Sequence, residues 1–176
     1  MNISGLYSVS FPCMEVTIKK SFKFRLELTE GQNERFRQFA GASRFAYNYA
    51  LARKKTIYKE TGKSITSGEI QKEITRMKQT PEYEWLNEIP SQIPQQSIQN
   101  LERAFAGFFK KRSGFPKFKK KHSWIQSFRI PQKIKVKDSR VFVPKLGYVK
   151  RIQSRPIEGR SNDEAVRIHR YSRIAV

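Results

Sequence analysis

The sequence contains a single cysteine, Cys13, and no long apolar run. One cysteine excludes a disulfide within the chain and a cysteine-rich zinc ribbon, and it is typical of the reducing cytoplasm. No stretch approaches the roughly 20 apolar residues that a membrane helix needs. The start of the chain also lacks the pattern of a signal peptide. We therefore expect a cytoplasmic protein without a membrane partner.

Acidic residues are scarce as well, because 15 Asp and Glu stand against 36 Lys and Arg, for a formal net charge of +21. The excess is concentrated in residues 110–160, which hold 17 Lys and Arg but only two acids, Asp138 and Glu158. Such a concentration indicates a face that binds a polyanion. With 38% hydrophobic and 12% aromatic residues, the chain can still bury a core, which excludes a disordered polybasic tail.

Motifs for catalysis are missing from the sequence. A two-metal nuclease needs several carboxylates that converge on Mg²⁺, whereas the basic half offers only Asp138, Glu158, Asp163 and Glu164. Neither His122 nor His169 lies in a recognisable nucleophile context, and no Walker loop or dinucleotide fingerprint occurs. The sequence therefore predicts no catalytic residue, no metal site and no cofactor, and we expect no enzymatic activity from these residues.

Hydrophobic periodicity predicts one strand followed by a block of helices. Apolar and charged residues alternate over residues 15–28, which indicates a strand with one buried face. Thr29 and Gln32 form a capping box at the start of a helix. Gly41 predicts a kink or an end there, and a second helix is expected roughly from Ser43 to Glu60.

Two further helices complete this block. Thr66 and Glu69 form a second capping box, and Pro81 ends the helix that they start. A fourth helix is expected after Pro94, because an apolar face recurs at helical spacing in Ile98, Leu101, Phe105 and Phe108.

Period two returns in the basic half, where Ile134 and Val136 alternate with lysines and residues 141–149 continue the pattern. The order of strand, helices and basic strands predicts an α+β fold, in which one β module is interrupted by a helical insertion. Residues 1–14 show no clear period, and translation from Met14 is a further hypothesis. The tail, residues 161–176, receives no assignment beyond a brief alternation.

Residues 114–131 carry the strongest functional signal, because lysines interleave there with aromatic side chains. Cations neutralise phosphates and displace their counterions, and aromatic faces accept unstacked bases. The pattern favours a nucleic-acid contact over the alternative, which is a solvated basic loop whose aromatic rings pack into a core.

Several local patterns together resemble the TnpB (OrfB) family of insertion-sequence transposon proteins. The resemblance lies in the shared order and spacing of six segments across roughly residues 15–160. They are Phe22–Leu26, Thr29–Gln32, Ser43–Leu51, Gly114–Lys119, Ser127–Arg129 and Pro144–Lys150. The resemblance implies an incomplete wedge-type β-barrel from residues 15–28 and 113–160, with a helical recognition domain, residues 29–112, inserted after its first strand. Residues 1–14 would be an extension and residues 161–176 a tail of uncertain structure.

The family resemblance also implies function. Its members are RNA-guided DNA endonucleases with a RuvC-like nuclease and a zinc finger, neither of which is recognisable in this sequence. We therefore expect this chain to be the nucleic-acid-binding N-terminal module of a truncated TnpB-type transposase. It would bind a transposon-derived guide RNA and DNA without cutting them. It would lie in the cytoplasm, and at the nucleoid when DNA is bound. The alternative is a stand-alone structural or regulatory RNA- or DNA-binding protein.

The candidate binding residues come from both lines of inference. The helical motif of the family contributes Arg44, Tyr47 and Asn48, although Tyr47 and Asn48 serve equally well as helix-packing residues, and both roles stay open. The basic half contributes phosphate-binding cations and rings that either stack on bases or pack: Phe115, Lys117, Phe118, Lys119, Lys120, Lys121, Trp124, Phe128, Arg129, Lys133 and Lys135.

Overall fold

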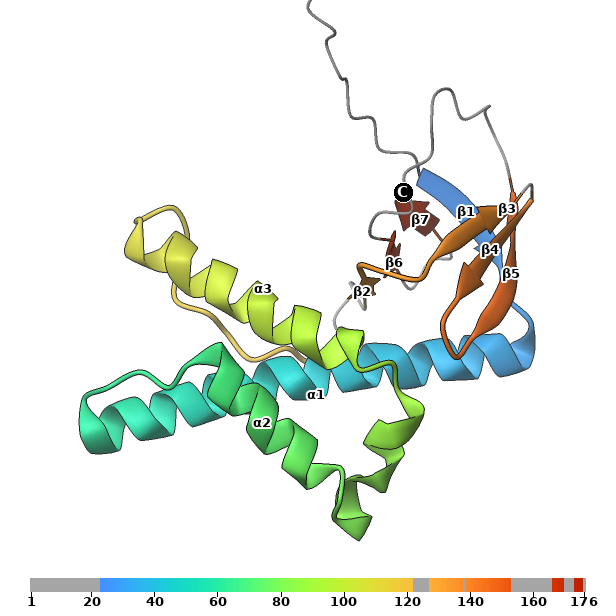
Figure 1. Cartoon of the computed structure of the whole chain (residues 1–176). Coiled ribbons are helices and arrows are strands. Elements are labelled where there is room, and N and C mark those ends of the chain that lie inside the picture. The colour runs from blue at the N-terminus through green and yellow to red at the C-terminus, as the bar shows by residue number, and fades with distance from the viewer. Residues whose placement is uncertain (1–22, 122–126, 138, 153–165, 170–172, 176) are drawn as a thin grey trace, which may run out of the picture.

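The computed structural model describes residues 23–121, 127–137, 139–152, 166–169 and 173–175. In Figure 1, a helical part and a β-sheet meet along one long helix. The helical elements are α1 (Glu30–Thr61), α2 (Ser67–Met77), the 3₁₀ helix η1 (Pro81–Glu88) and α3 (Gln92–Phe109). The strands are β1 (Lys23–Glu27), β2 (Ser127–Ile130), β3 (Lys135–Lys137), β4 (Arg140–Val143), β5 (Gly147–Ile152), β6 (Val166–His169) and β7 (Arg173–Ala175).

Both predicted capping boxes are confirmed. At the start of α1, Gln32 N–H donates to Thr29 Oγ1 (3.4 Å) and Thr29 N–H donates to Gln32 Oε1 (3.2 Å). At the start of α2, Glu69 N–H donates to Thr66 Oγ1 (3.3 Å) and Thr66 N–H donates to Glu69 Oε2 (2.9 Å). Each box satisfies backbone donors that a helix start leaves without partners, so local sequence alone fixes where these two helices begin.

The predicted break at Gly41 is wrong, because α1 runs unbroken from Glu30 to Thr61. A glycine inside a helix costs about 1 kcal/mol relative to alanine. Residues on both sides of it, including Phe39, Ala42 and Ala46, are buried in the core, and this burial outweighs the local cost. The helix ends at Gly62, whose left-handed backbone (φ 68°) and N–H bond to the Tyr58 carbonyl (2.9 Å) form the expected cap.

The seven strands form one antiparallel sheet in the order β2-β6-β7-β1-β5-β4-β3. The predicted strands over residues 134–149 are confirmed as β3, β4 and β5. The tail, which the sequence left unassigned, supplies β6 and β7, and this pair lies between β2 and β1. The α+β class is confirmed. The strand order is linear in the described part of the chain, so barrel closure and the domain boundaries stay predictions.

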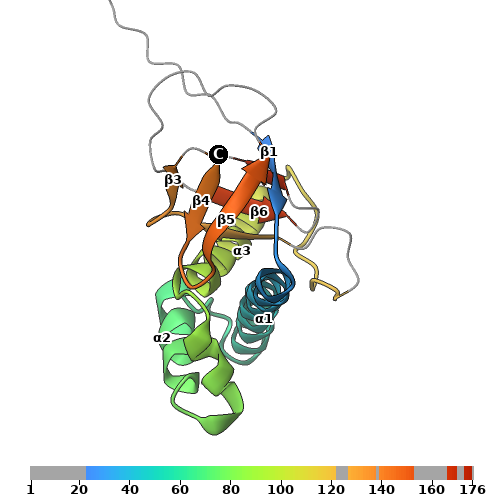
Figure 2. The same cartoon turned by 90° about the vertical axis from the view of Figure 1, so that its right-hand side faces the viewer.

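One continuous core joins the sheet to the helices. Phe128 of β2 packs against Phe36 and Phe39 of α1, with ring centroids 5.0 and 5.5 Å apart. Small side chains let α1, α3 and β2 approach closely, because Ser43 Oγ lies 2.8 Å from Ser97 Oγ and donates to the Ser127 carbonyl (3.3 Å). Figure 2, viewed along α1, shows the sheet above the helices. This packing holds the two parts in a defined orientation.

The β4–β5 hairpin is attached to the helical part by polar contacts. Gln32 Nε2 donates to the Tyr148 carbonyl (3.0 Å), and Arg35 Nη1 donates to the Lys145 carbonyl (3.3 Å). Lys145 Nζ in turn donates to the Asn87 carbonyl of η1 and to the Ile89 carbonyl just after it (3.5 Å). Lys145 thus links three elements. None of the described helices combines the length and apolarity needed to cross a membrane.

Candidate nucleic-acid interface

Residues 113–121 follow α3 and are held on α1 by hydrogen bonds to the side chain of Asn48. Asn48 Nδ2 donates to the Lys119 carbonyl (2.9 Å), and Lys119 N–H donates to Asn48 Oδ1 (2.8 Å). Both functional atoms of the amide are therefore used by the backbone of the basic segment. Asn48 was considered either as a contact to DNA or as a residue that holds the helices together. The two hydrogen bonds fit the second role.

Tyr47 lies next to Asn48 and is also used internally. Its side chain is buried, and that burial raises the pKa of the phenol above its ordinary value. Lys119 Nζ lies 4.2 Å from the centre of the Tyr47 ring, which is a cation–π contact. Arg44, one turn earlier on α1, is partly buried. The contacts of Tyr47 and Asn48 thus position the basic segment on α1.

The remaining lysines of the segment point outward: Lys117, Lys120 and Lys121 are exposed. The rings of Phe115 and Phe118 are 43% and 49% exposed. Exposed cations beside exposed rings are the arrangement that the sequence predicted for a nucleic-acid contact. Trp124 lies outside the described residues.

The other aromatic candidate, Phe128, is only 2% exposed and packs in the core. Of the two roles considered for it, the structure gives it the packing role, because a ring enclosed by other side chains presents no face to a base. The next residue, Arg129, is on the opposite face of β2 and is half-buried. The alternation along β2 therefore separates a core residue from a candidate cation.

The candidate residues lie on two separate surfaces. Lys133 and Lys135 are exposed at and near β3, an outer strand of the sheet. Figures 1 and 2 both place β3 and residues 113–121 on opposite sides of the molecule. The structure thus brings Lys117, Lys120 and Phe118 together but does not join them to the β3 lysines.

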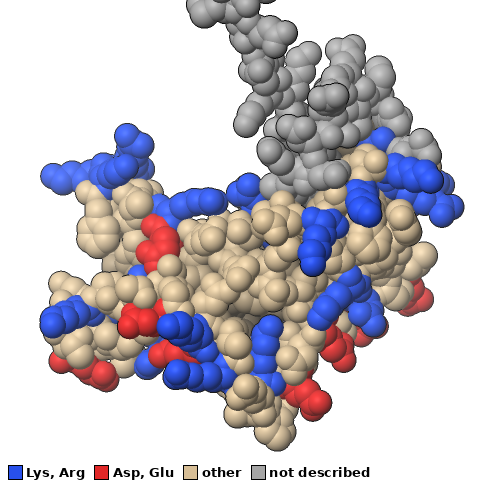
Figure 3. All heavy atoms as spheres, in the orientation of Figure 1, with Lys and Arg blue, Asp and Glu red and all other residues tan. Residues whose placement is uncertain are grey.

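The surface charge supports this division. Residues 103–152 carry sixteen Lys and Arg against one acid, Asp138. Figure 3 shows Lys and Arg gathered at the end of α3 and over β3 to β5, whereas both signs alternate over α1 and α2. One cation of β5, Lys150, pairs with Glu27 of β1 at 2.7 Å. No group of three or more His, Cys, Asp or Glu that could hold a metal ion occurs in the described ranges. A long-range attraction for polyanions follows from this distribution.

Sequence reasoning missed a cleft between the ends of α1 and α3. It has a volume of about 740 Å³ and is lined by aromatic rings of α3 and by side chains of α1, among them Lys55 and Tyr58. Lys55 Nζ lies 5.2 Å from the centre of the Phe115 ring and 5.1 Å from that of Phe118. The sequence signal was present, since Phe105, Phe108 and Phe109 are closely spaced at the end of α3 and Phe115 follows soon after.

An α+β scaffold with concentrated cations and exposed rings is typical of nucleic-acid-binding modules. A family model described as a helix-turn-helix domain of the OrfB IS605 type matches residues 14–63, a range that includes β1 and all of α1. The chain is 41% identical over 142 residues to "Putative RNA-guided DNA endonuclease InsQ" of Escherichia coli (strain K12), covering 80% of this chain and 35% of that protein.

Two further relatives extend the comparison. A protein of Streptomyces pristinaespiralis named "Putative RNA-guided DNA endonuclease" is 31% identical over 102 residues, covering 58% of this chain and 25% of that protein. The "Virulence protein VsdF" of Salmonella dublin is 34% identical over 103 residues, covering 53% of this chain and 87% of that protein. The chain thus spans about a third and a quarter of the two relatives named as endonucleases. It belongs to the TnpB (OrfB) family.

Proposed function

We propose that this chain is a nucleic-acid-binding module of a TnpB-type protein, which holds a transposon-derived guide RNA and DNA. The observation that carries the proposal is the concentration of cations in residues 103–152, which hold sixteen Lys and Arg against one acid, Asp138. Its membership of the TnpB family and the names of two relatives, which refer to RNA and DNA, support the choice of polyanion.

The two basic surfaces suit two nucleic-acid partners. One surface consists of residues 113–121 on α1. The other lies along β3, the edge strand on the opposite side of the molecule. A protein that reads a duplex through shape, and leaves sequence reading to a paired RNA, needs contacts to the backbones of both nucleic acids. Two separate cationic surfaces on one rigid core supply such contacts at the same time.

We assign binding and not cleavage to these residues. Metal-assisted phosphodiester cleavage needs carboxylates that converge on the metal ions. The acids of the basic half are too few, and Asp163 and Glu164 are adjacent in the sequence, so on a strand they would point to opposite faces. Strand scission by the purified chain in Mg²⁺ would overturn this assignment.

The salt dependence of binding tests the proposal. Each phosphate contact contributes about 0.7–0.9 to the slope of log K against log salt. Replacement of Lys117, Lys120 and Lys121 by Gln should therefore reduce the slope by roughly two to three units in a filter-binding assay. The matched control replaces Lys63, Lys72 and Arg76, near and on α2, by Gln and removes the same charge from another face.

Equal slopes for the wild type and the Lys117/Lys120/Lys121 variant would contradict the assignment of this surface. A reduction of the same size in the α2 control would also contradict it, because the effect would then report net charge rather than location.

A second candidate is a stand-alone RNA- or DNA-binding protein with a structural or regulatory role. The observation that favours it is that the match to this chain covers 87% of the VsdF protein, so this relative extends little beyond the matched part. Sequencing of the RNA that copurifies with the chain separates the two candidates. Enrichment of transposon-end RNA supports the first, and a dispersed set of cellular RNAs supports the second.

A further inference from the structure

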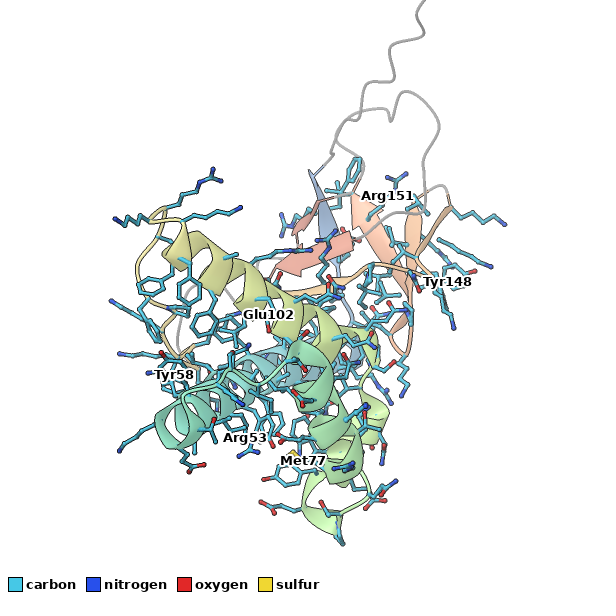
Figure 4. All side chains as sticks on the ribbon, turned by 60° about the vertical axis from the view of Figure 1, so that its left-hand side comes forward. Arg53, Tyr58, Met77, Glu102, Tyr148 and Arg151 are labelled. Atoms are coloured by element: carbon cyan, nitrogen blue, oxygen red, sulfur yellow. The ribbon has the colours of Figure 1, made fainter. Side chains whose placement is uncertain are left out.

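The cleft between the ends of α1 and α3 is unusual because its most prominent rings are left in water. Tyr58 of α1 is 64% exposed and Phe109 of α3 is 75% exposed. Both line the same cleft, and Figure 4 shows Tyr58 near the end of α1, on the side of the α3 end. An aromatic side chain offers 150–250 Å² of surface that folding normally buries. Two exposed rings that line one cleft make it a candidate binding site.

The rings behind these two are already arranged by contacts with one another. Phe115 meets Phe105 and Phe108 edge to face, with centroids 5.6 and 5.3 Å apart. Phe105 and Phe109 lie nearly parallel at 6.3 Å. The cleft therefore has a preformed aromatic wall, so a planar ligand that enters it meets faces and edges that need little rearrangement.

The charge of the cleft identifies the occupant. Glu102 is the one carboxylate among its described lining residues, and Lys54 pairs with it at 2.9 Å. Lys55 and Lys59 of α1 also line the cleft, and the residues that follow Phe109, which are Lys110, Lys111 and Arg112, are exposed cations. A second copy of this chain, itself at +21, would be repelled. The complementary ligand is planar, apolar on its faces and negatively charged along its length.

We propose that this cleft binds unpaired bases of a single-stranded polynucleotide. Tyr58 and Phe109 stack on bases, while Lys55 and Lys59 contact the adjacent phosphates. The site deepens the proposed function and rests on it, because it adds base stacking to the phosphate contacts of residues 113–121. Stacking uses the base faces and is tolerant of sequence, so the cleft grips an unpaired segment of any sequence.

Two oligomers of equal length and charge test the proposal on the wild-type chain. One is a twelve-nucleotide oligothymidylate, and the other is the same backbone without bases. Each stacked base contributes about 1–3 kcal/mol, which corresponds to about a 5- to 140-fold tighter dissociation constant. The base-bearing oligomer should therefore bind at least about fivefold more tightly at the same ionic strength.

A double variant locates the effect. Tyr58→Leu with Phe109→Leu keeps apolar side chains but removes both ring faces, and both positions are exposed, so the core stays intact. The preference for the base-bearing oligomer should disappear, while affinity for the abasic oligomer and its salt slope stay at the wild-type values. Tyr148→Leu is the control, because Tyr148 is a similarly exposed ring (53%) on β5, outside the cleft.

The outcomes separate this inference from the proposed function. Equal affinity of the wild type for the two oligomers would overturn base stacking and leave phosphate binding in place. A preference that survives in the double variant, or that Tyr148→Leu abolishes, would also overturn the assignment to the cleft. Failure to bind either oligomer at low salt would overturn the proposed function itself.

Discussion

Asn48 offers the sharpest test of how the basic segment is positioned. Its amide makes two hydrogen bonds with the backbone of Lys119, at 2.8 and 2.9 Å. A hydrogen bond contributes about 0.5–1.5 kcal/mol net, and both of these are exposed to solvent, so together they are worth about 1–2 kcal/mol. Asn48→Ala removes both bonds, but it also gains up to about 0.7 kcal/mol of helix propensity.

The matched control is Asn100→Ala on α3. It gains the same helix propensity and loses only one local bond, from Arg103 Nη1 to Asn100 Oδ1 at 3.3 Å. The two variants differ by a net loss of one hydrogen bond, so the difference in free energy of unfolding between them should be about 0.5–1.5 kcal/mol, measured by urea denaturation with circular dichroism. The comparison cancels the propensity term, which would otherwise hide about half of the effect.

Amide exchange provides a local measurement of the same contact. The Lys119 N–H donates to Asn48 Oδ1, so its exchange should accelerate by about 5- to 30-fold in Asn48→Ala, which corresponds to about 1–2 kcal/mol. The reasoning is refuted if Asn48→Ala matches Asn100→Ala in stability and in Lys119 exchange while DNA binding falls. Asn48 would then act as a direct contact to nucleic acid.

Two further predictions concern the core and the loss of stability at acidic pH. Phe128→Ala should lower the free energy of unfolding by about 3–5 kcal/mol, because it leaves a cavity in the core. Phe118→Ala, at the surface, should change it by no more than about 0.5 kcal/mol. Similar urea midpoints for the two variants would contradict the assignment of Phe128 to the core. Hydrogen bonds, chiefly from Arg53 and also from Tyr49, lower the pKa of the Glu73 carboxyl below 4.5. The ionised carboxylate therefore stabilises the fold above pH 4.5, and this stabilisation is lost as the pH falls through the pKa of the folded state. Glu73→Gln should make the free energy of unfolding depend less on pH in this range, and an unchanged pH dependence in chemical denaturation would refute the assignment.

Local chemistry predicted much of the helical part. The capping boxes at Thr29 and Thr66 form because each involves only residues three apart in the chain. The alternation over residues 134–149 likewise predicted β3 to β5, because a strand with one buried face needs side chains of period two. Gly41 shows the limit of such reasoning, since burial of its neighbours decides whether a helix continues through a glycine.

The candidate site divides in the same way. Composition predicted which half is cationic, because charge is a property of the residues themselves. It did not predict that Phe128 is enclosed while Phe118 is exposed, because that difference depends on the packing of β2 against α1. Nor did it predict that Asn48 meets Lys119, 71 residues further along.

The sequence by itself determined the family, the α+β class, the starts of α1 and α2 and the concentration of cations, all of which follow from residue identity and short-range spacing. It did not determine the start of α3, which begins at Gln92, before Pro94. Tertiary structure decided where β6 and β7 lie, which rings are exposed, that the cations form two separate surfaces, and that rings of α1 and α3 line one cleft. The physical reason is that short strands and single rings gain most of their stability from partners distant in the chain.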